Sequence, residues 1–285
     1  MRLTSLLFSS FVIFSVPAYS ASVWKVTHAG NTVYIGGTVH ILSQEDYPLP
    51  KEYKAAYQKA QKLVFETDMA AIESLEFQQK TLLEMTYQDG RTFKDTLSEP
   101  VSSAVEKHLS ARGVPVENLL PFKPSLLSIT LSMLEFQVIG LNSQGVDKYF
   151  STLAMGDNKA IGWLESPDQQ LEFLAGLGRG QEDQLIAYTL AEIETLKASV
   201  DELRQQWRAG DMQGLAASNI DEMVAKFPAI YNDLLLARNT QWIPQIKAML
   251  EDQTTEFVLV GVLHLAGPDS VLKMLEADGY SIERL

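Results

Sequence analysis

The stretch FVLVGVLH at residues 257–264 decides how this chain folds. Its first four residues are apolar, which is typical of a strand buried on both faces, and a Gly-x-x-His sequence, Gly261 to His264, follows at once. The same arrangement occurs near the start of the chain, where TVYIG at residues 32–36 is followed by GTVH at residues 37–40. Glycine at a strand end permits a tight turn or the close approach of another group. Each of the two strand ends is therefore expected to deliver one imidazole.

Outward from the first motif, the sequence predicts a β-hairpin and then a β-α-β unit. Two short β-rich runs, residues 23–27 and 32–36, are joined by turn residues. Pro48 and Pro50 mark a loop and the start of a helix, and an apolar strand at residues 63–65 follows. Such a crossover makes its two strands parallel, so that their carboxyl ends lie at one edge of the sheet. Open α/β sheets bind ligands at that edge.

The remaining chain is predicted to be mostly helical, and no low-complexity linker divides it. We expect one α/β domain over residues 21–285, with a mixed central sheet, flanking helices and a large helical insertion at about residues 70–155 and 180–250. The predicted elements are a buried helix at 126–139, a strand at 159–164, a long amphipathic helix from Glu182 to about Gly210, a helix at about 269–277 and an edge strand at 280–284.

Acidic side chains are expected at the same edge of the sheet as the histidines. Glu66 follows the second strand of the β-α-β unit, and Glu165 follows the next predicted strand. Two imidazoles with a carboxylate suit zinc, manganese, cobalt or ferrous iron. His40, Glu66 and His264 are therefore candidate metal ligands, and Glu165 is a candidate general base or further ligand. Alternatively, either glutamate could cap a helix or pair with Arg238, and a single histidine after a strand is more often a structural residue.

Arg238 and Asn239 form a polar pair inside a helix otherwise built from leucine and tryptophan. An arginine in that setting could clamp a substrate carboxylate or stabilise a developing oxyanion. Equally, it could form an ion pair that holds the helical insertion on the sheet. The two other histidines, His28 in the hairpin turn and His108 on a polar helix, are expected to be exposed.

The first twenty residues have the features of a secretory signal peptide. Arg2 precedes a short apolar run at residues 6–16, and Ala18 to Ala21 offers a small-x-small cleavage site. The run is shorter than the roughly 20 apolar residues of a membrane-spanning helix, so no membrane anchor is expected after cleavage. The chain has no cysteine, which fits a periplasmic or secreted protein that folds without disulfides. Its formal net charge of −13 argues against nucleic acid and anionic lipid as partners.

Six short motifs occur in a fixed order along the chain. They are WKV at 24–26, GGTVH at 36–40, FETD at 65–68, WLES at 163–166, ARN at 237–239 and VGVLHLAG at 260–267. Together they resemble the TraB/GumN family, which includes the animal TIKI proteins, over nearly the whole chain after residue 20. The resemblance implies an α/β fold with paired histidine motifs, related to erythromycin-esterase-like and haem-binding ChaN-like proteins. TIKI proteins are regarded as metal-dependent proteases that use manganese or cobalt. By this resemblance the paired histidines are His40 and His264, the strand-end glutamate is Glu66, and the Arg-Asn pair is Arg238 and Asn239.

These observations favour an exported metal-dependent hydrolase, with a peptidase as the leading class and a peptide or small molecule as substrate. His40, Glu66 and His264 would converge on a manganese, cobalt or zinc ion whose bound water becomes the nucleophile. Arg238 with Asn239 would polarise or hold the scissile carbonyl group. Two alternatives stay open. One is a non-catalytic binding protein for haem, iron or a peptide signal, and the other is a metal-independent hydrolase that uses a histidine as general base.

Overall fold

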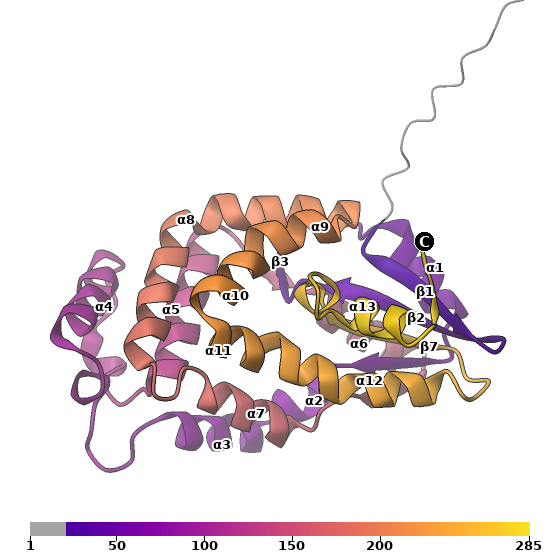
Figure 1. The fold of residues 1–285 in the computed structure, drawn as a ribbon. Coiled ribbons are helices and arrows are strands. Elements are labelled where there is room, and N and C mark those ends of the chain that lie inside the picture. The colour runs from indigo at the N-terminus through magenta and orange to yellow at the C-terminus, as the bar shows by residue number, and fades with distance from the viewer. Residues whose placement is uncertain (1–20) are drawn as a thin grey trace, which may run out of the picture.

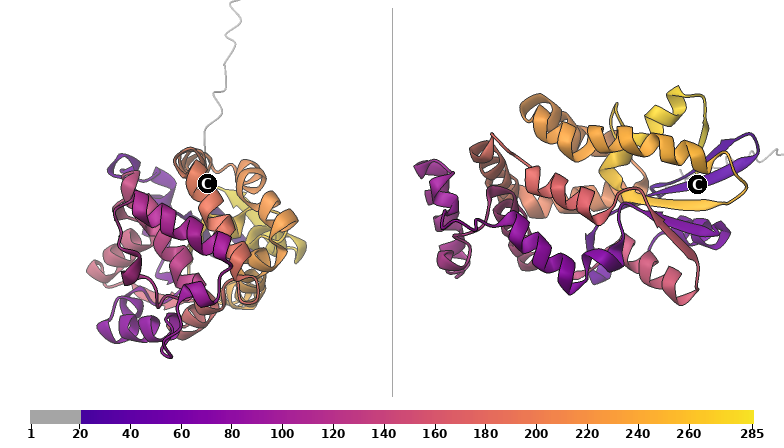
Figure 2. Two further views of the ribbon diagram at one scale, coloured as in Figure 1. Left: turned by 90° about the vertical axis from the view of Figure 1, so that its left-hand side faces the viewer. Right: turned by 90° about the horizontal axis from the view of Figure 1, so that it is seen from below.

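The computed structural model describes residues 21–285, in which a six-stranded sheet lies between two layers of helices (Figure 1, Figure 2). The expected signal peptide, residues 1–20, lies outside the described residues. The strand order is β6-β4-β7-β2-β1-β8, and β3 and β5 form a separate two-stranded sheet. The strands are β1 (Val23–His28), β2 (Asn31–Thr38), β3 (Ile41–Leu42), β4 (Lys62–Phe65), β5 (Ser143–Gln144), β6 (Ala160–Trp163), β7 (Glu256–Gly261) and β8 (Ser281–Arg284).

Helices make up most of the remaining described chain, which confirms the predicted mixed α/β class. The α-helices are α1 (Lys51–Lys59), α2 (Met69–Ile72), α3 (Leu75–Met85), α4 (Glu99–Ala111), α5 (Pro124–Val138), α6 (Val146–Gly156), α7 (Pro167–Gly176), α8 (Glu182–Ala209), α9 (Met212–Leu215), α10 (Asp221–Lys226), α11 (Pro228–Tyr231), α12 (Ala237–Met249) and α13 (Val271–Ala277). Short 3-10 turns are η1 (Gln44–Asp46), η2 (Phe93–Asp95), η3 (Val116–Asn118) and η6 (Val262–Leu265), and two π-helical segments are η4 (Ala216–Ile220) and η5 (Asn232–Leu236).

The chain enters the sheet through the predicted hairpin. β1 and β2 are antiparallel, and His28 lies opposite Asn31, so that Ala29 and Gly30 form the turn. Both turn residues have positive φ, 49° and 94° respectively, as a two-residue turn matched to the strand twist requires. β8 pairs with the other side of β1 and is an edge strand, as predicted.

Four parallel strands place the two Gly-x-x-His motifs side by side. β7 pairs in parallel with β2 on one side and with β4 on the other, and β6 continues the parallel set beyond β4. β7 therefore lies between the two strands that α1 connects. Thr38 is opposite Gly261, and Phe65 is opposite Leu259. The carboxyl ends of all four strands consequently lie at one edge, where a ligand site is expected.

Alternating side chains of the central strands supply an apolar core on each face of the sheet. On one face, Tyr34 and Phe257 pack in a core with residues of α1 and α6. On the other face, Ile35 and Val258 pack in a core with residues of α12 and α13. Figure 2 shows the strands between these two helical layers. The strands are buried on both faces because the crossovers cover both with helices.

The helical insertion extends away from the sheet and has a core of its own (Figure 1). Phe93, Leu109, Leu131 and Ile186 belong to this core, which unites residues of α4, α5 and α8 without a strand residue. The last helix of each inserted segment, α6 and α12, returns to cover one face of the sheet. The segments predicted as insertion therefore include two helices that belong to the sheet layers.

The long helix α8 connects the insertion core with the sheet core. It begins at Glu182 as predicted and ends before Gly210, whose φ of 62° terminates the helix in the left-handed region. Ile186 belongs to the insertion core and Trp207 to a sheet core. Between them Leu203 and its neighbours on the apolar stripe are only half-buried. The apolar side of this amphipathic helix is therefore fully buried at its two ends only, because the helix spans two cores.

The apolar helix predicted at residues 126–139 is α5, and it is buried on one side rather than throughout. Leu127 and Leu131 are buried, whereas Met133 and Val138 are exposed. Within residues 21–285, no helix combines the length and the apolar composition that crossing a membrane requires.

Candidate functional site

The two Gly-x-x-His motifs touch at the carboxyl edge of the sheet. His40 lies two residues beyond β2, and His264 lies in η6, directly after β7. Gly37 makes the contact possible, since a Cβ atom added there would lie 2.8 Å from Cγ2 of Val262 in the second motif. The close approach expected from glycine at these strand ends is therefore observed.

Gly261 marks the point where three of the predicted site residues converge. A Cβ atom added to Gly261 would lie 3.3 Å from Oε1 of Glu66, 3.5 Å from Cδ2 of His264 and 3.6 Å from Nε2 of His40. The backbone N–H of Gly261 also donates to Oε1 of Glu66 at 2.6 Å. Residues more than two hundred positions apart thus face one small space, as the shared sheet edge predicted.

Arg238 of α12 is the centre of the buried part of the site. Its Nε and Nη2 donate to the two oxygens of Glu165 at 2.8 and 2.9 Å, and Nη2 also donates to Oε2 of Glu66 at 2.6 Å. The arginine side chain is 11% exposed, and those of Glu66 and Glu165 are 8% and 6% exposed. One guanidinium therefore compensates two buried carboxylates, and the ion pair considered for Arg238 is present.

The charge of Arg238 controls the ionisation of Glu66. Burial acts to raise the pKa of Glu66, but the nearby guanidinium, followed by the two imidazoles, lowers it to about 2. Burial likewise opposes the charge on Arg238, whereas Glu66 and Glu165 raise its pKa. Glu66 and Arg238 are consequently charged near neutral pH.

The side chain of Glu165 bonds to Arg238 and to Trp242. Besides the two bonds from the guanidinium, its Oε1 accepts a hydrogen bond from Nε1 of Trp242 at 2.9 Å. A general base needs a lone pair within reach of the proton that it removes. Both oxygens of Glu165 are already engaged, so the geometry favours a residue that positions Arg238 over the base or metal ligand that the sequence suggested.

Asn239 positions His264 rather than reaching into the site. Its Oδ1 lies 2.6 Å from Nδ1 of His264, and its Nδ2 donates to the backbone carbonyl of Asp269 at 2.8 Å. An amide oxygen only accepts, so Nδ1 of His264 carries the proton and Nε2 offers its lone pair to Nη1 of Arg238 at 3.2 Å. Burial, assisted by Arg238, lowers the pKa of His264 to about 3 although Glu66 opposes the shift. His264 is therefore neutral near pH 7.

His40 has a carboxylate partner that sequence reasoning missed. Oδ2 of Asp147, in the first turn of α6, lies 2.8 Å from Nδ1 of His40. The side chain of Asp147 is 7% exposed, while that of His40 is 63% exposed. The charge of Asp147, together with the hydrogen bond to it, raises the pKa of His40 to about 9. His40 is therefore mostly protonated near pH 7. The carboxylate also directs Nδ1–H towards itself, which leaves Nε2 of His40 facing the space around Gly261.

Gly145, two residues before Asp147, is the sequence feature that accompanies this contact. Gly145 precedes α6, and a Cβ atom there would clash with the backbone carbonyl group of His40. The backbone N–H of Val146 donates to the carbonyl oxygen of Val39 at 3.1 Å. A glycine followed by an acidic residue in the first turn of a helix is a common pattern. The sequence alone therefore does not identify Asp147 as the partner of His40; the tertiary contact does.

A cavity of about 280 Å³ adjoins these groups. It lies at the strand ends of both motifs and reaches the helical insertion. His40, Arg238 and His264 line it, whereas Glu165 and Asn239 do not. The other lining residues are Thr38, Val39, Leu203, Met223, Leu234, Leu235, Gly261, Val262 and Leu263.

The expected ligand set of His40, Glu66 and His264 does not fit a divalent metal ion in this arrangement. Arg238 bridges Oε2 of Glu66 and Nε2 of His264, so a fixed cation already occupies the position between these two donors. Within residues 21–285, no group of three or more histidine, aspartate or glutamate side chains is placed to hold a metal ion. A metal-bound state would require Arg238 to move away from its partners.

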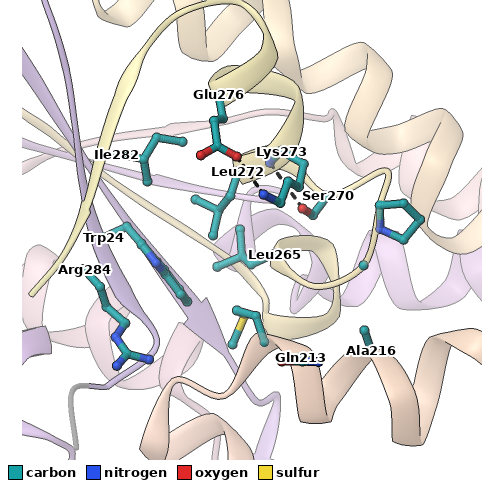
Figure 3. Close-up of a pocket in the computed structure, with 13 residues that line it drawn as sticks. Trp24, Gln213, Ala216, Leu265, Ser270, Leu272, Lys273, Glu276, Ile282 and Arg284 are labelled. Carbon is teal, nitrogen blue, oxygen red and sulfur yellow. Dashed lines mark hydrogen bonds and ion pairs between the residues drawn. The ribbon is translucent and has the colours of Figure 1, made fainter.

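A larger cavity, of about 590 Å³, lies elsewhere, between the β1–β8 edge of the sheet and α13 (Figure 3). Trp24, Leu265 and Leu272 contribute apolar surface to it. Its charged residues have partners, since Lys273 donates to Glu276 at 2.7 Å and Arg284 donates to a backbone carbonyl at 2.7 Å. The cavity includes none of the predicted site residues, so its greater size does not identify it as a reaction site.

The remaining polar residues have local roles. His28 is exposed, as predicted. The expectation for His108 is wrong, because its side chain is only 15% exposed and its Nε2 lies 3.1 Å from Oε1 of the buried Glu135. Asp68 caps α2 by accepting hydrogen bonds from two backbone N–H groups.

The lowered pKa values predict that acid destabilises the protein. Unfolded chains bind a proton at His264 near pH 6.5, but the folded chain does so only near pH 3, so stability decreases as the pH falls below 6.5. Glu66 adds to the loss below pH 4.5 because its pKa is about 2 in the folded state. Glu256 opposes this loss between pH 7 and pH 4.5, because burial raises its pKa to about 7. Melting temperatures of the wild type and of variants, measured from pH 7 to pH 4, separate these contributions. A His264→Asn variant should show a shallower slope between pH 6.5 and pH 4.5, whereas His28→Asn should keep the original slope.

Comparison of the chain with curated proteins and with solved structures finds no match. The model of the TraB/PrgY/gumN family matches residues 22–284, which include all six motifs and every residue of the His40, Arg238 and His264 site. This chain belongs to the TraB/PrgY/gumN family.

Proposed function

We propose that this protein is an exported hydrolase in which His40, oriented by Asp147, removes a proton from water as the water oxygen attacks a substrate carbonyl carbon. The imidazolium of His40 then gives that proton to the leaving alcohol or amine as the C–O or C–N bond breaks. The bond between Asp147 and His40 carries the proposal. It resembles the carboxylate–imidazole pair of hydrolases in which a buried acid fixes the histidine tautomer and stabilises the imidazolium that forms. In this chain Nε2 of His40 faces the cavity, where a water molecule and a carbonyl group would meet, and it can accept a proton in those molecules whose imidazole is neutral.

Arg238 is suited to stabilise the negative charge that develops on the carbonyl oxygen. A guanidinium has five N–H donors, and four of them are directed at Glu165, Glu66 and His264. The fifth, on Nη1, has no partner among residues 21–285, and Arg238 lines the cavity. Because the glutamates and His264 hold the guanidinium in place, it needs no reorganisation during the reaction, which makes such a donor effective.

The cavity favours a small reacting group over a porphyrin. Pockets for small molecules and cofactors usually measure about 300–1,000 Å³, and this one is at the lower limit with about 280 Å³. A porphyrin also needs an axial ligand and a broad apolar slot. Nε2 of His264 faces Arg238 instead, at 3.2 Å. The peptidase class remains part of the proposal, because a peptide bond and an ester both have a carbonyl carbon that water can attack. Export to the periplasm or the cell exterior also remains part of the proposal.

Hydrolysis should be measured first on ester and peptide substrates, with chelator and with added manganese, cobalt or zinc. The protein should be purified without a histidine tag and its metal content determined. We expect hydrolysis that chelator leaves unchanged and that requires no stoichiometric metal. Activity that is lost with chelator and restored by one metal ion would instead establish a metal enzyme whose Arg238 moves to admit the ion. Absence of hydrolysis under every condition would favour a binding protein.

The pH profile should report the ionisation of His40. A general base acts when deprotonated, so kcat/KM should rise with pH, and the rising limb should lie above pH 6.5 because Asp147 raises the pKa of His40 to about 9. Asp147→Asn removes that charge. Its rising limb should therefore move towards acid pH by at least roughly one pH unit, while the maximal rate falls. Stopped assays from pH 5 to pH 10 on both proteins measure this. A rate that falls through the same range would assign His40 as an acid.

A further inference from the structure

The wall of the cavity opposite the reacting groups is apolar and comes from the helical insertion. Leu203 of α8, Met223 of α10 and the adjacent Leu234 and Leu235 of η5 line it. Met223 and Leu235 are buried, at 6% exposure each. The reacting groups come from the sheet edge and α12, whereas this wall comes from segments that take no part in the proposed chemistry. A wall of this composition stabilises an apolar group that enters the cavity.

Thr38 adds one polar feature to the same cavity. It is 2% exposed, and its Oγ1 is buried without a hydrogen-bond partner among residues 21–285. Buried hydroxyl groups are almost always paired, so an unpaired one that lines a cavity indicates a ligand atom or a water molecule as partner. Thr38 is two residues before His40, at the end of β2. A ligand group bonded to Thr38 would therefore lie next to the reacting carbonyl group.

The charge of the cavity favours a neutral ligand. Arg238 and the protonated His40 are the cationic side chains that line it, and buried carboxylates already compensate both, Glu66 and Glu165 for Arg238 and Asp147 for His40. An anionic tail would find no uncompensated cation there, and an ammonium group would lie against leucine and methionine without a carboxylate partner. Both would lose hydration without a compensating contact.

The volume limits the length of the apolar group. At about 30 Å³ for each water-sized group, a cavity of 280 Å³ holds roughly nine such groups. Part of that space belongs to the carbonyl group and the attacking water. We propose that the site takes substrates whose acyl part is a short, neutral aliphatic chain of roughly four to eight carbons, with the chain against Met223 and Leu235 and a polar atom beside Thr38. This inference rests on the proposed hydrolase function for its chemistry.

A series of p-nitrophenyl esters tests the chain length directly. Each buried methylene contributes about 0.8 kcal/mol, which corresponds to about fourfold in kcat/KM. We expect kcat/KM to rise from acetate through butyrate to hexanoate and to fall again at laurate. Met223→Trp should shift the optimum to acetate or butyrate, because the indole would fill the space that a longer chain occupies. Leu82→Trp, at an exposed position on α3, is the matched control and should leave the series unchanged.

Binding of neutral amides gives a readout that is independent of turnover. Acetamide, hexanamide and octanamide are titrated into the wild type, Met223→Trp and Thr38→Val, with the melting temperature as signal. We expect tighter binding of hexanamide than of acetamide, loss of this preference in Met223→Trp, and roughly three- to tenfold weaker binding of all amides to Thr38→Val.

The outcomes separate this inference from the proposed function. Hydrolysis with no dependence on chain length, together with equal binding of all amides, overturns the acyl-chain pocket and retains the hydrolase. Length-dependent binding without any hydrolysis retains the pocket and overturns the hydrolase. An unchanged optimum in a folded Met223→Trp protein also overturns the pocket, because the indole would then not enter it.

Discussion

Replacing Arg238 with alanine is expected to lower the free energy of unfolding by about 3–5 kcal/mol. The guanidinium compensates Glu66 and Glu165, which are both buried, and it accounts for the pKa of about 2 at Glu66. Without it, two carboxylates remain in a poorly solvated site and must become protonated or admit water. Urea-induced unfolding followed by circular dichroism measures the change.

Two further variants show whether the loss comes from the uncompensated carboxylates. Arg238→Met combined with Glu66→Gln and Glu165→Gln removes all three charges and should recover much of the stability. Lys247→Ala, on the same helix as Arg238, removes an exposed ion pair with Asp278 and should leave the unfolding curve nearly unchanged. A loss below about 1 kcal/mol for Arg238→Ala would contradict the role of Arg238 as the compensating cation.

Replacing His40 with glutamine is expected to lower kcat/KM by about 10²–10⁴-fold, the usual contribution of a general base. Glutamine can still donate a hydrogen bond to Asp147 but cannot accept the proton of the attacking water. Because the His40 side chain is 63% exposed, the melting temperature should change little. This combination of lost turnover and retained stability is the opposite of what Arg238→Ala should show.

His28→Gln is the matched control for His40→Gln, since His28 is an exposed histidine at the hairpin. It should retain full activity and stability. Assays of initial rates at the pH optimum of the wild type, with thermal unfolding of each variant, make the comparison. If His40→Gln keeps activity within about threefold of the wild type, His40 is not the base, and His264 or a metal-bound water becomes the stronger candidate.

The elements of the fold could be predicted because their signals are local. Apolar runs ended by glycine predict the strands around residues 33–36 and 257–260, and turn residues predict the hairpin at Ala29 and Gly30. The crossover through α1 implies parallel strands, because a helix between two strands returns the chain to the end of the sheet where the first strand began. Helix α8 was predictable in extent, but its half-buried middle was not, because burial depends on which core each end reaches.

His40, Glu66 and His264 lie near one another at the sheet edge, whereas the roles of the predicted site residues depend on contacts that a sequence does not contain. Glu165 and Asn239 were expected to act on substrate, but they bond to Arg238 and His264 and do not line the cavity. The metal set was reasonable from ligand types alone. The position of Arg238 between Glu66 and His264 changes that assessment, because a cation in the site weakens the case for another.

The sequence by itself determined which side chains lie at the carboxyl edge of the sheet, since strand ends and parallel connections follow from local patterns. Only the tertiary structure decided which of them pair. β7 inserts between β2 and β4, which brings His264 beside Glu66. Asp147, over a hundred residues from His40, reaches it because Gly145 allows two backbone segments to touch. Hydrogen bonds and ionisation depend on distances of a few ångströms, and residue spacing along the chain does not specify these when helical insertions separate the partners.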